Sequence, residues 1–245
     1  MAVMRPIRAV FFDLDETLGK DRESNRYSIT QTVPLLLQKH PGHDPAVVAD
    51  TFIETNRTHW ENFDESPIAP LSDPIQVRTL LWTETLQRLG IDDEELAQAM
   101  GRRYQQARQA SYQPYEDSLS ILDALRGDLP LALVSNGNSA MQRMKLGVCK
   151  LENRFDYIFI AQEVGYSKPK PQIYAQAVEA VGVAAQECLM VGDNLEKDIE
   201  GAQRAGLQAA WMRRHPDGPT PTDSHADYVI HTMAELQTLL ISVNA

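Results

Sequence analysis

Short apolar runs alternate with helical segments through the second half of this 245-residue chain, and this alternation restricts the fold more than any other feature. Each run has the length and apolar content of a buried strand, and one further run of the same kind lies near the start of the chain. The predicted strands cover residues 7–12, 130–134, 157–160, 188–191 and 207–212. The predicted helices cover residues 118–127, 139–147, 171–181 and 195–205. This pattern predicts an α/β fold, a Rossmann-like parallel sheet with helices on both faces.

A long helical insert interrupts the alternation after its first strand. Between residues 20 and 112 the strand pattern is absent, and four amphipathic helical segments with short connections follow one another. Residues able to cap a helix, one in a capping box and two directly before a proline, predict where these helices start: Ser28, Asp44, Asp73 and Asp92. We therefore expect a core domain formed by residues 1–19 and 113–245, with an inserted helical domain at 20–112. Residues 214–225 predict a loop before a last strand and helix.

Composition excludes several classes of partner. The chain carries 34 acidic and 23 basic side chains, a net charge of −11, which argues against binding a nucleic acid polymer through its phosphates. No apolar run reaches the roughly 18 to 20 residues of a membrane-spanning helix, so no membrane partner is expected. Two cysteines cannot form a disulfide framework, which favours a cytoplasmic location. A small anionic substrate stays compatible with this charge, and the oligomeric state stays open.

Polar residues with unusual chemistry follow three of the predicted strands. Asp13-Leu-Asp15-Glu-Thr17 ends the first, Ser135-Asn136-Gly137 the second, and Gly192-Asp193-Asn194 the fourth along the chain. Ligands of open α/β sheets bind beyond the carboxyl ends of the strands, so these side chains are expected to converge. Aspartates gathered there would repel one another without a cation, and Mg²⁺ is the hard, oxygen-preferring ion expected beside a phosphate. Each motif by itself is compatible with an ordinary turn or helix cap, and their joint occurrence favours a site.

These strand-end motifs, together with Ser167-Lys168-Pro169 and Asp198, resemble the four motifs of the haloacid dehalogenase superfamily in order and residue type. The resemblance covers about residues 10–19 and 115–213, and the insert is similar to the helical class-I cap of that superfamily. Within it, the chain most resembles the phosphatase branch, such as nucleotide and acyl-sugar-phosphate phosphatases. The resemblance implies a Mg²⁺-dependent phosphomonoester hydrolase. Its partner would be a small soluble phosphorylated metabolite, cleaved through an aspartyl-phosphate intermediate.

The resemblance also implies roles for three aspartates. Asp13 would be the nucleophile that attacks phosphorus, and its side chain would touch the metal. Asp15 would protonate the leaving oxygen and then activate water, while its backbone carbonyl binds the metal. Asp193 would supply the second metal-binding side chain.

Further residues would bind the phosphoryl group or support the metal. Ser135 and the backbone N–H of Asn136 would hydrogen-bond a phosphoryl oxygen, and Lys168 would neutralise charge on the phosphoryl group and on Asp13. The residues expected to support the metal site from around it are Thr17, Asn194 and Asp198.

Three other functions compete with hydrolysis. No sequence feature distinguishes a sugar phosphomutase on the same fold from a hydrolase, and analysis of the reaction products would distinguish them. A dehalogenase attacking carbon is disfavoured because Asp15, Asp193 and Asp198 are all present. A non-catalytic binding protein is disfavoured because every required side chain remains.

Two local features depart from the main pattern. Glu16 stands where this superfamily often has a glycine, at a turn position. The segment Arg213-Arg214-His215 could reach an anion, but a solvated strand end is the favoured interpretation.

Overall fold

The computed structural model describes residues 5–215 and 225–244. Within this part of the chain, six parallel strands form one sheet in the order β3-β2-β1-β4-β5-β6. The strands are β1 (Ala9–Phe12), β2 (Leu131–Ser135), β3 (Tyr157–Ile160), β4 (Cys188–Gly192), β5 (Gln208–Met212) and β6 (Tyr228–Ile230). The α/β fold with a parallel sheet, predicted from the alternation, is confirmed.

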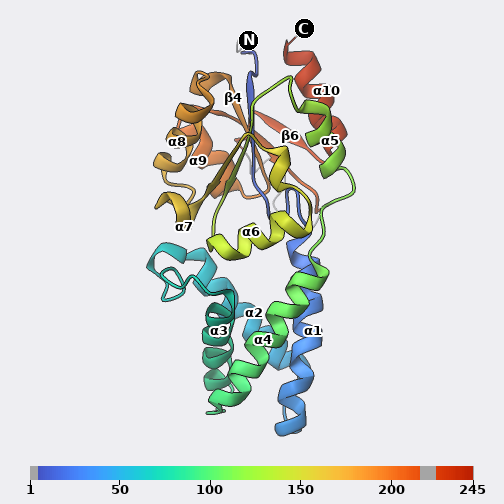
Figure 1. Ribbon diagram of the computed structural model, residues 1–245, viewed down its shortest axis with the longest axis vertical. Helices are drawn as coiled ribbons and strands as arrows, with labels where there is room; N and C mark the ends of the chain where they lie inside the picture. Colours follow the sequence, from blue (N-terminus) through green and yellow to red (C-terminus); the bar gives the residue numbers. More distant parts are fainter. Residues whose placement is uncertain (1–4, 216–224, 245) are drawn as a thin grey trace. The chain divides into compact units, whose positions relative to one another are not determined.

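Helices cover both faces of the sheet. On one face, Ala9 and Phe11 of β1 pack in one apolar cluster with α8 (Pro171–Val181) and α9 (Gly201–Arg204). On the other lie α5 (Ser118–Leu125) and α10 (Met233–Asn244) (Figure 1). All four residues of β1 are fully buried, because neither face of the sheet meets water. This double coverage explains why the strands are continuous apolar runs rather than alternating ones.

Shorter elements complete the sheet unit. They are η2 (Glu152–Arg154), α7 (Ala161–Val164), η3 (Ala185–Glu187) and η4 (Leu195–Glu200), the last a π-helix. The helix predicted at 195–205 therefore starts with a wider turn, a form that is frequent at functional sites. The last strand and helix expected from the sequence are β6 and α10, while most of the loop predicted at 214–225 lies outside the described residues.

The chain divides into two compact units. The first comprises residues 1–20, 114–136 and 149–245, and the second comprises residues 21–113 and 137–148. The helices of the second unit are α1 (Asp21–Lys39), α2 (Pro45–Glu61), η1 (Phe63–Glu65), α3 (Pro74–Arg88), α4 (Glu94–Ser111) and α6 (Ser139–Val148). Residues 137–148 thus fall outside the sheet unit, although the sequence pattern grouped them with it. No helix of the described ranges is both long and apolar enough to cross a membrane.

Local capping chemistry determines where two of these helices begin. The carboxylates of Asp44 and Asp73 each accept a hydrogen bond of 2.8 Å from a backbone N–H in the first turn, as predicted. Asp93, not Asp92, caps α4. The predicted start at Ser28 is wrong, because α1 already begins at Asp21.

A tertiary interaction explains the earlier start of α1. The carboxylate of Asp21 pairs with the buried cations of Arg108 and Lys145, both in the second unit. These charges hold the pKa of Asp21 well below its usual range, although burial acts in the opposite direction. Ser28 lies inside the helix, where its hydroxyl donates to the carbonyl of Ser24.

The core of the second unit depends on close helix packing. The rings of Phe52 and Trp82 stack with centroids 4.0 Å apart, and both residues are fully buried. Near them α3 and α4 meet at Gly101. A Cβ atom there would lie 2.8 Å from the backbone nitrogen of Thr79 and 2.6 Å from its Oγ1. Only glycine permits this approach without a shift of one helix.

Two glycine substitutions test this packing. We expect Gly101→Ala to lower the free energy of unfolding by about 1–3 kcal/mol, because the added methyl group overpacks the contact with α3. Gly147→Ala is the matched control, since Gly147 also lies in a helix but has no atom within 4 Å of the added Cβ. The control should stabilise by up to about 1 kcal/mol through helix propensity. Urea unfolding followed by circular dichroism measures both, and equal effects would contradict the packing argument.

Candidate active site

The strand order brings three of the predicted motifs to one edge of the sheet. β1 lies between β2 and β4, so Asp13, Ser135 and Asp193 leave adjacent parallel strands in the same direction. The backbone N–H of Asp13 donates to the carbonyl of Val191 at 2.9 Å, which extends the pairing of β1 with β4. The indole N–H of Trp211 on β5 donates to the carbonyl of Asp193 at 2.9 Å.

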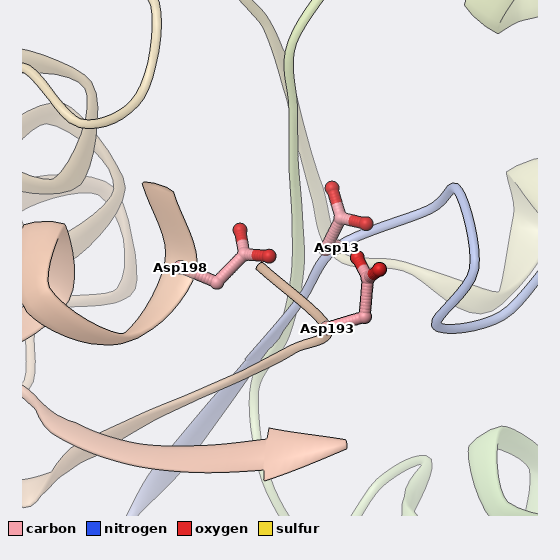
Figure 2. A group of neighbouring side chains, drawn as sticks. All are labelled: Asp13, Asp193 and Asp198. Atoms are coloured by element: carbon pink, nitrogen blue, oxygen red, sulfur yellow. The ribbon is translucent and has the colours of Figure 1, made fainter. Parts of the chain in front are cut away.

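An acidic cluster forms at this edge. One carboxylate oxygen from each of Asp13, Asp193 and Asp198 lies within 4.8 Å of the others, and Figure 2 shows the three side chains around a common space. Asp198 reaches it because Gly192 has no side chain: a Cβ there would lie 2.3 Å from the Cγ of Asp198. Asp198 is itself held by the backbone N–H of Asn194, which donates to its Oδ2 at 3.0 Å.

Lys168 places a cation between two of these carboxylates. Its Nζ lies 2.6 Å from Oδ1 of Asp13 and 2.6 Å from Oδ1 of Asp198. Burial alone would lower the pKa of this lysine, which is only 3% exposed, but the charges of the two aspartates outweigh that effect and raise the pKa. Lys168 is therefore a fixed positive charge at any pH near neutrality.

The nucleophile candidate has an unusual electrostatic environment. The pKa of Asp13 is raised to about 7, chiefly by burial; Lys168 acts to lower it, and the charges of Asp198 and Asp15 add to the rise. An additional cation close to Asp13 would lower this pKa, because a nearby positive charge favours the ionised form of a carboxyl group. The ionisation of Asp13 is thus coupled to whatever positive charge occupies the site.

Asn136 positions Lys168 through its backbone. The side-chain amide of Asn136 donates to the carbonyl of Lys168 at 2.8 Å, and its oxygen accepts from the N–H of Lys168 at 2.7 Å. The amide side chain is thereby committed to the lysine segment. Ser135 is 1% exposed at the end of β2.

These groups line one pocket of about 140 Å³. The lining residues are Asp13, Asp15, Ser135, Asn136, Lys168, Asp193, Asn194, Lys197 and Asp198. Eight of the nine candidate residues named from the sequence are therefore brought together.

Thr17 is not among the residues that line the pocket. It is fully buried, and its hydroxyl has no hydrogen-bond partner in the described part of the chain. Its carbonyl accepts from Nε of Arg214 at 2.9 Å, so Arg214 holds the backbone of the turn that follows Asp15.

Lys197 is a pocket residue that the sequence analysis missed. Its backbone N–H donates to the side-chain oxygen of Asn194 at 2.9 Å, and its carbonyl accepts from the hydroxyl of Tyr174. These bonds fix the backbone of Lys197 at the edge of the pocket that it lines. No motif marked it, since an isolated lysine in a helical pattern is ordinarily a solvated surface residue.

The donor set fits a hard divalent cation. Carboxylate oxygens of Asp13 and Asp193 come from adjacent strands, and such oxygens are the ligands Mg²⁺ prefers. Lys168 already neutralises part of the charge on Asp13 and Asp198, and Asp193 adds a third carboxylate to the cluster. The chemistry of these donors is thus compatible with one ion.

Comparisons with known proteins place this arrangement in a family. A family model described as haloacid dehalogenase-like hydrolase matches residues 7–206. An N-acylneuraminate-9-phosphatase from Rattus norvegicus is 31% identical over 242 residues, which cover 97% of this chain and 95% of the relative. The pyrimidine 5'-nucleotidase YjjG from Escherichia coli is 29% identical over 243 residues, covering 94% of this chain and 96% of the relative.

A solved structure shares the fold. The crystal structure of the HAD-hydrolase YfnB from Bacillus subtilis, bound to magnesium, matches with a TM-score of 0.74 at 22% identity. The match covers 96% of this chain and 99% of that one.

The raised pKa of Asp13 predicts that the free energy of unfolding of the metal-free protein decreases as the pH rises. The pKa of Asp13 is about 7 in the folded protein and 3.8 ordinarily, so between these pH values the folded state binds a proton that the unfolded state has released. Stability contributed by this group is therefore present below about pH 4 and is lost as the pH rises to 7. The side chain in Asp13→Asn does not titrate. The free energy of unfolding of this variant, relative to that of wild type, should therefore be about 2–4 kcal/mol higher at pH 8 than at pH 4. Chemical denaturation in EDTA measures this, and a difference independent of pH would contradict the assignment.

Proposed function

The chain belongs to the haloacid dehalogenase-like hydrolase family, and on that basis we propose that it hydrolyses the phosphomonoester of a small metabolite with Mg²⁺, through an aspartyl-phosphate. It is a phosphatase of this family, as relatives along nearly its whole length are. The observation that supports this mechanism best is the position of the buried Lys168 ammonium, 2.6 Å from both Asp13 and Asp198 in the pocket of about 140 Å³.

In the first half-reaction, Asp13 is the nucleophile. Its Oδ1 is engaged by Lys168, so Oδ2 is the oxygen that this ion pair leaves for attack on phosphorus. A bond forms between Oδ2 and phosphorus, and the ester P–O bond breaks. The leaving oxygen takes the electron pair of that bond and a proton from the carboxyl group of Asp15.

In the second half-reaction, Asp15 acts as the base. It takes a proton from water as the water oxygen attacks phosphorus, and the bond between phosphorus and Asp13 breaks. Inorganic phosphate leaves, Asp13 returns to its ionised form, and Asp15 is protonated again for the next cycle. Lys168, the hydroxyl of Ser135 and the N–H of Asn136 are the donors for the phosphoryl oxygens in both steps.

Asp13, Asp193 and the backbone carbonyl of Asp15 are the proposed ligands of Mg²⁺. The ion, when bound, neutralises the charge that gathers on the carboxylates and the phosphoryl group. Three further residues are proposed to support this site: Thr17, Asn194 and Asp198. Of these, Asp198 holds Lys168 directly.

We also propose a domain organisation and a location. Residues 1–19 and 113–245 form the catalytic core domain and residues 20–112 the helical cap domain, with residues 137–148 packing in the helical unit. Cys149 and Cys188 are buried and form no disulfide bond. This supports a cytoplasmic location, because thiols stay reduced in the cytoplasm.

Phosphate release from a substrate panel tests the function. The names of two relatives put N-acylneuraminate 9-phosphate and pyrimidine 5'-nucleotides first in the panel, beside flavin mononucleotide, sugar phosphates and phosphoglycolate. We expect release in Mg²⁺ that EDTA stops, and a loss of at least about 10³-fold in Asp13→Asn, because the covalent step is then absent.

The control for this experiment is Asp128→Asn, an exposed aspartate of the same unit, which should keep wild-type activity. Retained turnover in Asp13→Asn would overturn the mechanism. Transfer of the phosphoryl group to a second sugar phosphate, without free phosphate, would identify a mutase instead.

Asp193→Asn tests the metal ligand set. Loss of one carboxylate ligand should raise the Mg²⁺ concentration for half-maximal activity by roughly 10–100-fold, with activity partly restored at saturating metal. Titration of phosphate release against Mg²⁺ measures this. An unchanged midpoint would exclude Asp193 as a ligand.

A further inference from the structure

Glu16 has an unexpected conformation for its residue type. Its φ of 62° lies in the left-handed region that glycine adopts readily, and a side chain there costs free energy. The residue is nevertheless 6% exposed, so its carboxylate is directed into the protein. A glycine would form this turn without strain, so the glutamate must contribute through its side chain.

The Glu16 carboxylate meets two groups from distant parts of the sheet unit. Its Oε2 lies 2.6 Å from Nε2 of His215, which follows β5, and accepts from the hydroxyl of Tyr115 at 3.3 Å. The Tyr115 hydroxyl and His215 Nε2 are 3.2 Å apart, so the three groups form one closed cluster. The segment Arg213-Arg214-His215, interpreted from sequence as a solvated strand end, is therefore engaged in contacts.

Backbone bonds hold the same turn from both sides. The N–H of Tyr115 donates to the carbonyl of Leu18 at 2.9 Å, and Nε of Arg214 donates to the carbonyl of Thr17 at 2.9 Å. Asp117 in turn holds the guanidinium of Arg214 at 2.9 Å. The turn that follows Asp15 is thus fastened to residues 115–117 and to residues 214–215.

We propose that Glu16 and His215 are positioning residues for Asp15, a role that rests on the proposed function. Glu16 shares a peptide bond with Asp15, so fastening its side chain fixes the backbone from which the Asp15 carboxyl group projects. The pair holds Asp15 where its proton reaches the leaving oxygen. General acids need this geometry, because a small misplacement of the donor lowers the rate of proton transfer strongly.

The chemistry of the leaving group separates positioning from a merely structural role. When the ester P–O bond of phenyl phosphate breaks, the leaving phenolate is basic and gains from the Asp15 proton. The leaving group of p-nitrophenyl phosphate is a stabilised anion that needs little protonation. Displacement of Asp15 should therefore slow the cleavage of phenyl phosphate more than that of p-nitrophenyl phosphate. Damage to the phosphate-binding pocket should slow the cleavage of both esters equally.

The experiment compares kcat/KM for the two esters in the full-length protein with Mg²⁺. This parameter covers the steps through the first phosphoryl transfer, so the later role of Asp15 as a base does not enter. We expect His215→Ala to lower kcat/KM about tenfold for phenyl phosphate and less than about threefold for p-nitrophenyl phosphate. His215→Gln, which keeps a donor of similar reach, should restore most of the ratio.

Two more variants guard against a folding defect. Glu16→Gly should relieve the backbone strain and keep thermal stability near or above that of wild type. It should nevertheless lower kcat/KM for phenyl phosphate relative to kcat/KM for p-nitrophenyl phosphate, as His215→Ala does. His231→Ala is the matched control, because His231 pairs with Glu235 at 3.4 Å on the surface. It should leave both values unchanged.

The outcomes are distinct. Equal losses for the two esters, or no loss, in folded His215→Ala and Glu16→Gly overturn the positioning role and leave the proposed function intact. A wild-type protein that releases no phosphate from either ester in Mg²⁺ overturns the proposed function, and this inference with it.

Discussion

The buried contact of Lys168 with Asp13 and Asp198 is the interaction on which the site depends. Two carboxylates withdrawn from water would repel each other and favour their neutral forms, and the ammonium between them offsets part of that cost. Such a cluster persists only if each member is held. Asn136 holds the backbone of Lys168, and the N–H of Asn194 holds Asp198. Gly192 supplies the space for the approach.

The sheet supplies the directions from which these groups arrive. Asp13 and Asp193 leave neighbouring parallel strands, while Asp198 comes from the π-helix that follows β4. Because strand positions are fixed by ladder bonds and burial on both faces, the carboxylates cannot separate to relieve their repulsion. Burial is the largest cause of the raised pKa of Asp13, and the charges of Asp198 and Asp15 add to it, so a bound cation would favour the ionised form of this carboxyl group.

The sequence predicted those features whose causes are local. Apolar runs marked the strands, and side-chain caps such as Asp44 and Asp73 marked helix starts, because each depends on residues close in the chain. Features that depend on long-range contacts were missed. The start of α1 depends on Arg108 and Lys145, and the contact of Glu16 with His215 joins residues 199 positions apart.

The candidate site follows the same division. Asp13, Asp15, Ser135, Asp193 and Asp198 were named from motifs, and all of them line the pocket. Thr17 does not, because it is fully buried away from the pocket lining. Lys197 was missed because no sequence motif marks it, and only the fold brings it to the pocket. Residue type and order thus identified the chemistry, whereas the orientation of each side chain required the fold.

The strand order also governs how the molecule can be made. β1 ends at Phe12, whereas its two neighbours in the sheet begin only at Leu131 and Cys188. Most of the helical unit, by contrast, is one continuous stretch, residues 21–113, which leaves the ribosome before either neighbour. During synthesis, β1 and Asp13 after it therefore leave the ribosome before the two strands with which β1 forms hydrogen bonds. The pocket can therefore be completed only after Asp198 has been synthesised, and a chain truncated before residue 198 would lack one of the two carboxylates that contact Lys168.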